Sequence, residues 1–148
     1  IAESWSKEDA LAPIMHGYTY SGHPLACAAA LANLGIVVDE DLPANAAKIG
    51  NYFIDQLEVL KEFPTVGDIR GVGLMLAIEF VKDRRSKEAI PAFDPYFLAI
   101  QKSCMDNGVW VRIQANKMIF SPPLIFDKQH VDQALEAVKT ALSSVEYA

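Results

Sequence analysis

The stretch VGDIRGVGLMLAIEFV, residues 66–81, decides the fold of this chain. Glycines stand at positions 67, 71 and 73, and the residues after them alternate, with β-branched side chains among the apolar ones. This pattern is typical of two short strands or of one bulged strand, with the glycines at a bulge or a turn. We therefore expect the chain to change from helices to a sheet at this point.

The residues before this stretch predict two helices. Pro24 suits the first position of a helix, and the alanines that follow favour a helix over residues 24–38. A second helix is predicted over residues 42–61, and Pro64 ends it. Its apolar residues recur at helical spacing: Ala46, Ile49, Phe53, Leu57 and Leu60.

The residues after the stretch begin with a charged connection and a third helix. Asp94 followed by Pro95 predicts an N-cap and a first-turn proline. The helix should run to about Asn107 and end at Gly108, a residue suited to the C-terminal cap.

Two more strands and a last helix complete the predicted fold. Residues 109–114 and 118–123 predict strands joined by a hairpin at 115–117, and Asp127 predicts the cap of a final helix. The resulting fold class is α+β, a small and mainly antiparallel sheet covered on one side by helices. The final helix should turn one apolar face to the core: Val131, Ala134, Leu135, Val138 and Leu142.

The composition limits the function classes. Of the 148 residues, 51% are hydrophobic and 22% are charged, which supports a buried core. The net charge of -6 argues against non-specific nucleic-acid binding, and no apolar run reaches the length of a membrane span. Cys27 and Cys104 form no CxxC pair, which favours a reducing, cytoplasmic setting.

Several catalytic motifs are absent from the sequence. The chain contains no P-loop and no GxSxG elbow, and residues 70–73 lack the third glycine of a dinucleotide fingerprint. His16 and His23 have no third metal ligand nearby in the sequence, so we expect no metal site there.

The stretch HGYTYSGHP, residues 16–24, crowds polar and aromatic residues in front of the alanine-rich helix. From the residues alone, the simpler interpretation is that Thr19 and Ser21 cap the helix that begins at Pro24. The other interpretation is a phosphate site, because a hydroxyl and exposed turn amides can donate to phosphate oxygens.

Three segments together resemble the class III aminotransferases, which include the ω-transaminases and use pyridoxal phosphate. They are HGYTYSGHPLACAAALANL at 16–34, DIRGVGLMLAIEFV at 68–81, which is similar to the family's "RG.GL..gIE", and DNGVWVRIQANKMIFSPPLIFDKQHVDQAL at 106–135. The resemblance covers roughly residues 14–145. It implies the C-terminal small domain of a fold-type-I pyridoxal-phosphate transferase.

The resemblance also implies a cofactor-binding role for the turn. In the family, a threonine here reaches the cofactor phosphate of the neighbouring subunit in a homodimer, and Thr19 matches it. Tyr18 would add a backbone amide and a ring contact. Gly17 and Gly22 would let the chain approach closely.

Arg112 is the candidate substrate-binding residue. Alternation places Trp110 and Arg112 on one face of the predicted strand. The resemblance implies that an arginine here, shortly before "PPL", binds the α-carboxylate of the amino or keto acid and can swing aside. The alternative is an arginine in a surface salt bridge, worth at most about 1 kcal/mol. Arg70, among glycines and turns, is expected to be structural.

The resemblance further implies that the chain is incomplete as an enzyme. The family's Schiff-base lysine lies a few dozen residues before the Thr-Tyr-Ser-Gly-His-Pro segment, and Lys7 does not match it. No catalytic residue is therefore assigned. Residues 1–23 are interpreted as the tail of the large domain and the phosphate-contacting turn, and 24–148 as the linking helix and small domain. The chain alone should be inactive, and its bare alanine helix should promote self-association.

Three functions remain open at this point. The first is part of a homodimeric aminotransferase that moves an amino group between an amine or ω-amino acid and an α-keto acid such as pyruvate. The second is a stand-alone α+β interaction or regulatory domain without chemistry. The third is a related aminomutase or decarboxylase.

Overall fold

The computed structural model describes residues 17–147, and its contacts divide the chain into two units, Ile1–Asp39 and Glu40–Ala148. Lys7 and His16 lie outside the described residues. The sequence placed a boundary between residues 23 and 24 instead. That boundary concerns the domains of a larger parent and stays a prediction.

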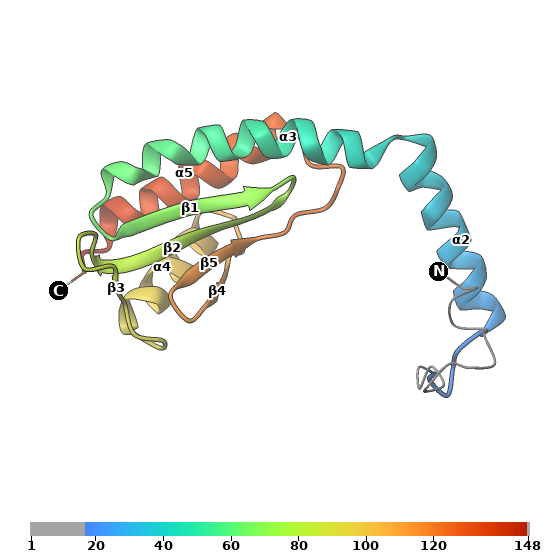
Figure 1. Ribbon diagram of the computed structural model, residues 1–148, viewed down its shortest axis with the longest axis horizontal. Coiled ribbons are helices and arrows are strands. Elements are labelled where there is room, and N and C mark those ends of the chain that lie inside the picture. Colours follow the sequence, from blue (N-terminus) through green and yellow to red (C-terminus); the bar gives the residue numbers. More distant parts are fainter. Residues whose placement is uncertain (1–16, 148) are drawn as a thin grey trace, which may run out of the picture. The chain divides into compact units, whose positions relative to one another are not determined.

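In the first unit, the described residues form a turn and helix α2, Pro24–Asp39 (Figure 1). The helix begins at the predicted proline and ends within one residue of the predicted end. None of its residues is buried.

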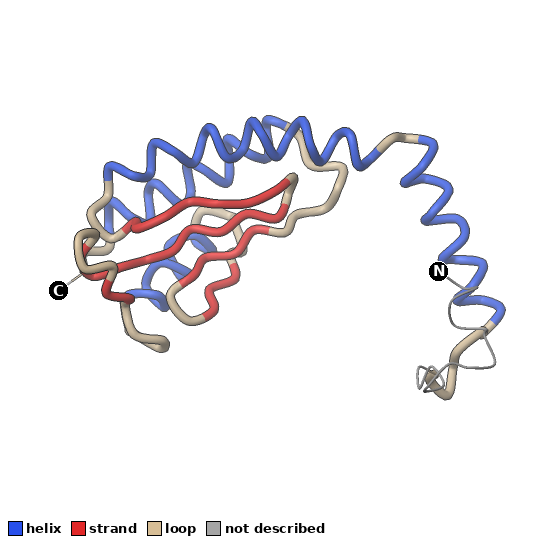
Figure 2. Tube along the Cα trace, in the orientation of Figure 1, coloured by secondary structure: helices blue, strands red, loops and turns tan. Residues whose placement is uncertain are grey.

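The second unit contains all the strands that the structure describes, together with three α-helices and a short 3₁₀-helix (Figure 2). Their bounds are α3 Leu42–Leu57, η1 Glu58–Glu62, β1 Val66–Val72, β2 Met75–Asp83, β3 Glu88–Ala89, α4 Pro95–Asp106, β4 Arg112–Gln114, β5 Lys117–Phe120 and α5 Lys128–Ser144. The order of the predicted elements is confirmed, with η1 and β3 as additions.

The strands form one sheet in the order β1-β2-β5-β4, with β3 paired to β2, and every recorded pairing is antiparallel. Residues 66–81 therefore make a two-stranded hairpin. Both glycine predictions are confirmed, because Gly73 occupies the turn with φ +55° and the register shifts at the bulge between Val66 and Asp68.

One face of the sheet is buried and the other is open. Residues on the buried face belong to one core together with side chains of α3, α4 and α5. Figure 1 shows α3 and α5 running along the sheet. The predicted α+β class, with helices on one side, is thus confirmed. The core residues of the buried face include Leu76, Ile78, Phe80, Met118 and Phe120.

The caps that the sequence predicts for α4 and α5 are present. The Asp94 carboxylate accepts a hydrogen bond from the Tyr96 amide, and Asp127 accepts one from the His130 amide. Gly108 follows α4 with φ +77°. These local signals fix where both helices begin and where α4 ends.

Three predicted elements are shorter in the structure. The strand predicted over 109–114 is β4, Arg112–Gln114. The helix predicted over 42–61 is α-helical only to Leu57 and continues as η1, which keeps Leu60 fully buried. The strand predicted over 118–123 ends at Phe120, since neither Pro122 nor Pro123 has an N–H for the ladder.

Helix α3 lies directly against the turn of the β1–β2 hairpin. A Cβ atom placed on Gly50 would fall 2.1 Å from the carbonyl oxygen of Gly73. Only a glycine at position 50 allows this approach of two backbones.

Candidate cofactor and substrate sites

The turn before α2 is closed by Ser21. Its hydroxyl accepts a hydrogen bond from the Tyr18 amide at 2.9 Å, and its own amide donates to the Tyr18 carbonyl at 2.9 Å. The first helical bond then runs from the Cys27 amide to the His23 carbonyl. Ser21 thus stabilises the turn, and its hydroxyl accepts from no helix amide among the described residues.

Thr19 lies at the exposed tip of this turn. Within the described part of the chain, its hydroxyl makes no hydrogen bond, so it does not cap α2. The amides of Thr19 and Tyr20 likewise donate to no acceptor among residues 17–147. A hydroxyl and two amides on one exposed turn are the donors that a phosphate group needs. This donor set fits the phosphate of pyridoxal phosphate.

Arg112 is exposed at the start of β4, an edge strand of the sheet. Its guanidinium donates to the side-chain oxygen of Gln114 at 2.9 Å. Among residues 17–147, no carboxylate lies within 4.0 Å of it. The interpretation as a surface salt bridge is therefore not supported, and the guanidinium keeps N–H donors for an outside carboxylate.

Arg70 shows the contrasting arrangement on the same open face. Its Nη1 lies 2.7 Å from a carboxylate oxygen of Asp68 and 2.7 Å from one of Glu79. The hydrogen bond from Arg70 is the main reason that the pKa of Glu79 falls below its usual value. Arg70 is satisfied within the fold, which agrees with its predicted structural role.

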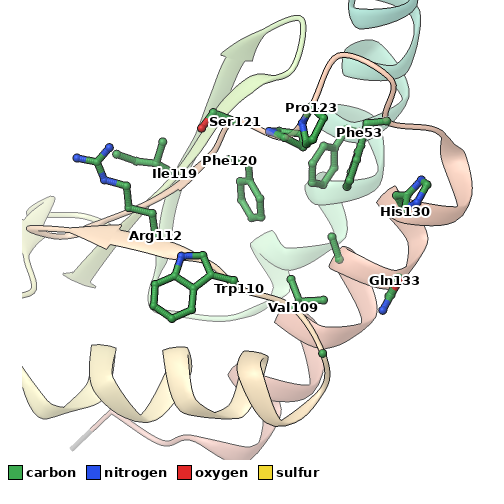
Figure 3. Close-up of a pocket in the computed structure, with 14 residues that line it drawn as sticks. Phe53, Val109, Trp110, Arg112, Ile119, Phe120, Ser121, Pro123, His130 and Gln133 are labelled. Atoms are coloured by element: carbon green, nitrogen blue, oxygen red, sulfur yellow. The ribbon is translucent and has the colours of Figure 1, made fainter.

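A pocket of about 510 Å³ opens where the β4–β5 ladder ends. The last recorded pair is Arg112 with Ile119, and extending the register would pair Trp110 with Ser121. The strands part there, because the prolines after Ser121 cannot donate. Figure 3 shows Trp110 and Val109 on one side of this opening and Ser121 and Pro123 on the other.

The pocket is mostly apolar. Its hydrophobic lining includes Phe53, Val109, Trp110, Ile119, Phe120 and Phe126. Among the described residues of the lining, Arg112 is the only Lys or Arg, and none is Asp or Glu. A fixed positive charge thus stands beside a hydrophobic opening.

His130 also lines the pocket but is engaged elsewhere. Its Nδ1 lies 2.6 Å from the Asp127 carboxylate, and its ring stacks on Phe126 with 5.0 Å between centroids. The His130 backbone amide, which donates to Asp127, is the main cause of the lowered pKa of that carboxyl. His130 is therefore part of the cap of α5.

Sequence reasoning identified Arg112 and placed Trp110 on the same face. It missed Ser121 and the opening between the strands. The two prolines directly after Ser121 were the signal available in the sequence, whereas the register that aligns Ser121 with Trp110 comes from the structure. Thr19 belongs to the first unit and Arg112 to the second, so the structure describes each candidate site within its own unit.

Residues 17–147 offer neither a metal-binding cluster nor a membrane-spanning helix. No group of three or more His, Cys, Asp or Glu side chains there could hold a metal ion. No helix in that range combines the length and apolar character needed to cross a membrane.

The family model of the class-III aminotransferases matches residues 3–142. The chain belongs to this family. It is 45% identical over 143 residues to an uncharacterized aminotransferase of Sinorhizobium fredii, and 36% identical over 138 residues to an ω-aminotransferase of Caulobacter vibrioides. Both alignments cover 93% of this chain and 30% of the relative.

A solved structure supports the same assignment. The chain resembles an amine transaminase from an uncultivated Pseudomonas species, solved with pyridoxal phosphate bound, with a TM-score of 0.85 and 42% identity. The match covers 90% of this chain and 30% of that structure. The aminotransferase chain thus spans about 30% of the length of the relatives it matches.

Proposed function

We propose that this chain is part of a cytoplasmic, homodimeric aminotransferase. The whole enzyme transfers an amino group between an amine or ω-amino acid and an α-keto acid such as pyruvate. The observation that carries the proposal is the Arg112 guanidinium, exposed beside an apolar pocket and without a carboxylate partner in the described chain. A keto acid supplies the missing carboxylate.

The cofactor of the proposed enzyme is pyridoxal phosphate. When bound, it supplies an electron-withdrawing ring that stabilises negative charge on the substrate carbon. The Thr19 hydroxyl and the turn amides would donate to its phosphate, with Tyr18 beside them. The hydrogen bonds of Ser21 hold this turn in shape, so the donors need little reordering. In a homodimer, the turn would serve the neighbouring subunit.

The proposed role of Arg112 requires a side chain that can bind a carboxylate and also move away. Its only recorded hydrogen bond within the described residues is the one to Gln114, and it has no ion pair there. Release of this single exposed bond costs little. Arg112 can therefore swing aside for substrates without a carboxylate.

The 148-residue chain alone is proposed to be inactive, because no lysine in it stands where the family's Schiff-base lysine is expected. Purified chain mixed with pyridoxal phosphate should form no borohydride-trappable adduct at one lysine. It should also not convert amine and pyruvate. Either activity would overturn this placement.

The substrate test uses the whole enzyme with variants in this chain. Arg112→Ala should raise the KM for pyruvate more than the KM for a simple amine, because only the keto acid carries the carboxylate. Arg85→Ala is the matched control, since Arg85 is exposed and its side chain has no recorded ion pair in the described chain. An unchanged pyruvate KM in Arg112→Ala would contradict the proposal.

The cofactor test measures retention of pyridoxal phosphate during dialysis. Thr19→Ala should release the cofactor faster, whereas Thr140→Ala, at an exposed position of α5, should not. A whole enzyme that binds no pyridoxal phosphate would favour the non-catalytic interaction domain. One that binds it but releases CO₂, or moves the amino group within one molecule, would favour the decarboxylase or aminomutase.

A further inference from the structure

The open face of the sheet carries a compact group of four side chains at the end of the β4–β5 ladder. Arg112 pairs with Ile119 in the last recorded pair of the ladder, and Trp110 and Ser121, two residues beyond this pair on the two chain segments, line the same pocket. We call these four residues the ladder-end patch. All four side chains line the same pocket, so one small molecule bound there can contact them.

Trp110 is the unusual member of the ladder-end patch. Its side chain is 75% exposed, although an indole is one of the largest apolar groups in a protein. Within the described residues, its ring makes no aromatic or cation–π contact, so it is not held by the Arg112 guanidinium. The exposed indole of Trp110 is therefore available to a ligand, and so is the nearby Arg112 guanidinium, which has no ion pair among the described residues.

The charges around the ladder-end patch restrict its ligand. Arg112 offers one positive charge, and the other basic group in the pocket lining, His130, is paired with Asp127. A dicarboxylate would leave one of its charges without a partner against an apolar wall. A monocarboxylate with a hydrophobic body fits both the guanidinium and the indole.

We propose that Trp110 is a specificity-determining residue that selects carboxylate substrates with an aromatic or large hydrocarbon side chain over small ones. The inference rests on the proposed function, because it takes the Arg112–carboxylate contact as given. The carboxylate lies on Arg112, and the hydrophobic body lies on Trp110 and Ile119.

A binding experiment with the 148-residue chain tests this proposal without catalysis. The labelled chain is titrated with 3-phenylpropionate, propionate and 3-phenylpropan-1-ol while the indole and guanidinium N–H signals are followed by NMR. 3-Phenylpropionate should bind at least about fivefold more tightly than propionate, because the phenyl ring gains contact with the indole. Trp110→Ala should reduce this preference to within about twofold and leave propionate binding unchanged.

Two variants separate the possible failures. Phe93→Ala is the matched control for Trp110→Ala, because Phe93 is a 96% exposed aromatic outside the ladder-end patch and should not alter the preference. Arg112→Gln should weaken binding of both carboxylates and not of the alcohol.

Each remaining outcome has a definite meaning. If both carboxylates depend on Arg112 but Trp110→Ala keeps the full preference, the role of Trp110 is wrong and the proposed function stands. If neither carboxylate binds, both the patch and the Arg112 assignment are overturned. Amino transfer by the whole enzyme is measured separately, so its loss or presence does not decide the role of Trp110.

Discussion

Helices α2 and α3 have the same length, 16 residues, and opposite environments. The sequence of α2, PLACAAALANLGIVVD, is the more apolar of the two, yet none of its residues is buried. The sequence of α3, LPANAAKIGNYFIDQL, contains charged and amide side chains, yet it buries five residues in the core. Hydrophobicity alone therefore does not decide which helix is buried within this chain.

The arrangement of the apolar residues explains the difference. In α3 they form one stripe, which packs on the sheet, while polar residues face solvent. In α2 they surround the helix, so no single face is suited to one partner. A helix that is hydrophobic on all sides is typical of the interior of a large protein. This agrees with the much greater length of the relatives.

The largest expected difference between exposed and buried positions is in thiol reactivity. Cys27 of α2 is exposed, whereas Cys104 of α4 is 0% exposed, and burial raises its pKa to about 11. With iodoacetamide at pH 8 and low micromolar protein, Cys27 should react at least about a thousandfold faster, because Cys104 requires unfolding. Mass spectrometry gives both rates. Similar rates in native buffer would contradict the burial of Cys104, and in urea the rates should converge.

The raised pKa also has a consequence for stability. Because the neutral thiol is favoured in the fold, its contribution is present below pH 9.0, the ordinary value, and is lost as the pH rises toward about 11. Cys104→Ala should flatten the decline in unfolding free energy over that range.

Leucine truncation should give the next largest difference. Leu57 at the end of α3 is 0% exposed, and Leu31 in the middle of α2 is 71% exposed. Leu57→Ala should lower the free energy of unfolding by about 3 kcal/mol, through lost burial and the cavity left behind. Leu31→Ala should change it by less than about 0.5 kcal/mol. Urea titration followed by circular dichroism measures both, and equal losses would mean that α2 is buried in solution.

Two glycine-to-alanine substitutions should change the stability by smaller amounts and in opposite directions, one in α3 and one in α2. Gly50→Ala in α3 places a methyl group against the Gly73 backbone and should destabilise the chain by about 2 kcal/mol. A Cβ on Gly35 in α2 meets nothing within 4 Å. Because alanine has the higher helix propensity, Gly35→Ala should stabilise the helix by up to about 1 kcal/mol. Thermal melts of both variants test this. An unchanged melting temperature in Gly50→Ala would show that the hairpin turn does not contact α3 at position 50.

Substitutions of exposed leucines in α2 should have the smallest effect on folding stability but a large effect on self-association. The exposed leucines of α2 leave an apolar surface that should promote self-association of the chain. The double variant Leu31→Ser and Leu34→Ser should shift light scattering toward the monomer and reduce dye binding, with little change in core stability. A clean monomer of the unaltered chain, with no dye binding, would refute this expectation.

Much of the fold could be predicted because its signals are local. Asp94 with Pro95 predicts the start of one helix, and Asp127 predicts the start of another. The glycines of residues 66–81 predict the hairpin. Each signal acts through neighbours within a few residues. The two-residue strand β3 was missed, because only its pairing with β2 identifies it.

The candidate sites also combine features that local sequence predicts with features that depend on distant residues. The sequence and its family resemblance identified Arg112 and Thr19 as residues of interest. Whether each is free depends on distant groups that no local pattern reveals. Arg70 and Arg112 are both exposed arginines of the sheet, but Arg70 is paired with Asp68 on its own strand and with Glu79 on the neighbouring strand, and the second partner is known only from the sheet pairing.

The close contact between Gly50 and Gly73 also bears on how the chain folds. It joins segments separated by only about 20 residues, so closing that loop costs less entropy than pairing β2 with β5, which lie about 40 residues apart. Helix α3 and the first hairpin can therefore form a nucleus early. We expect the later strands to add to a template that already exists, with the edge of the sheet that carries Arg112 assembled last.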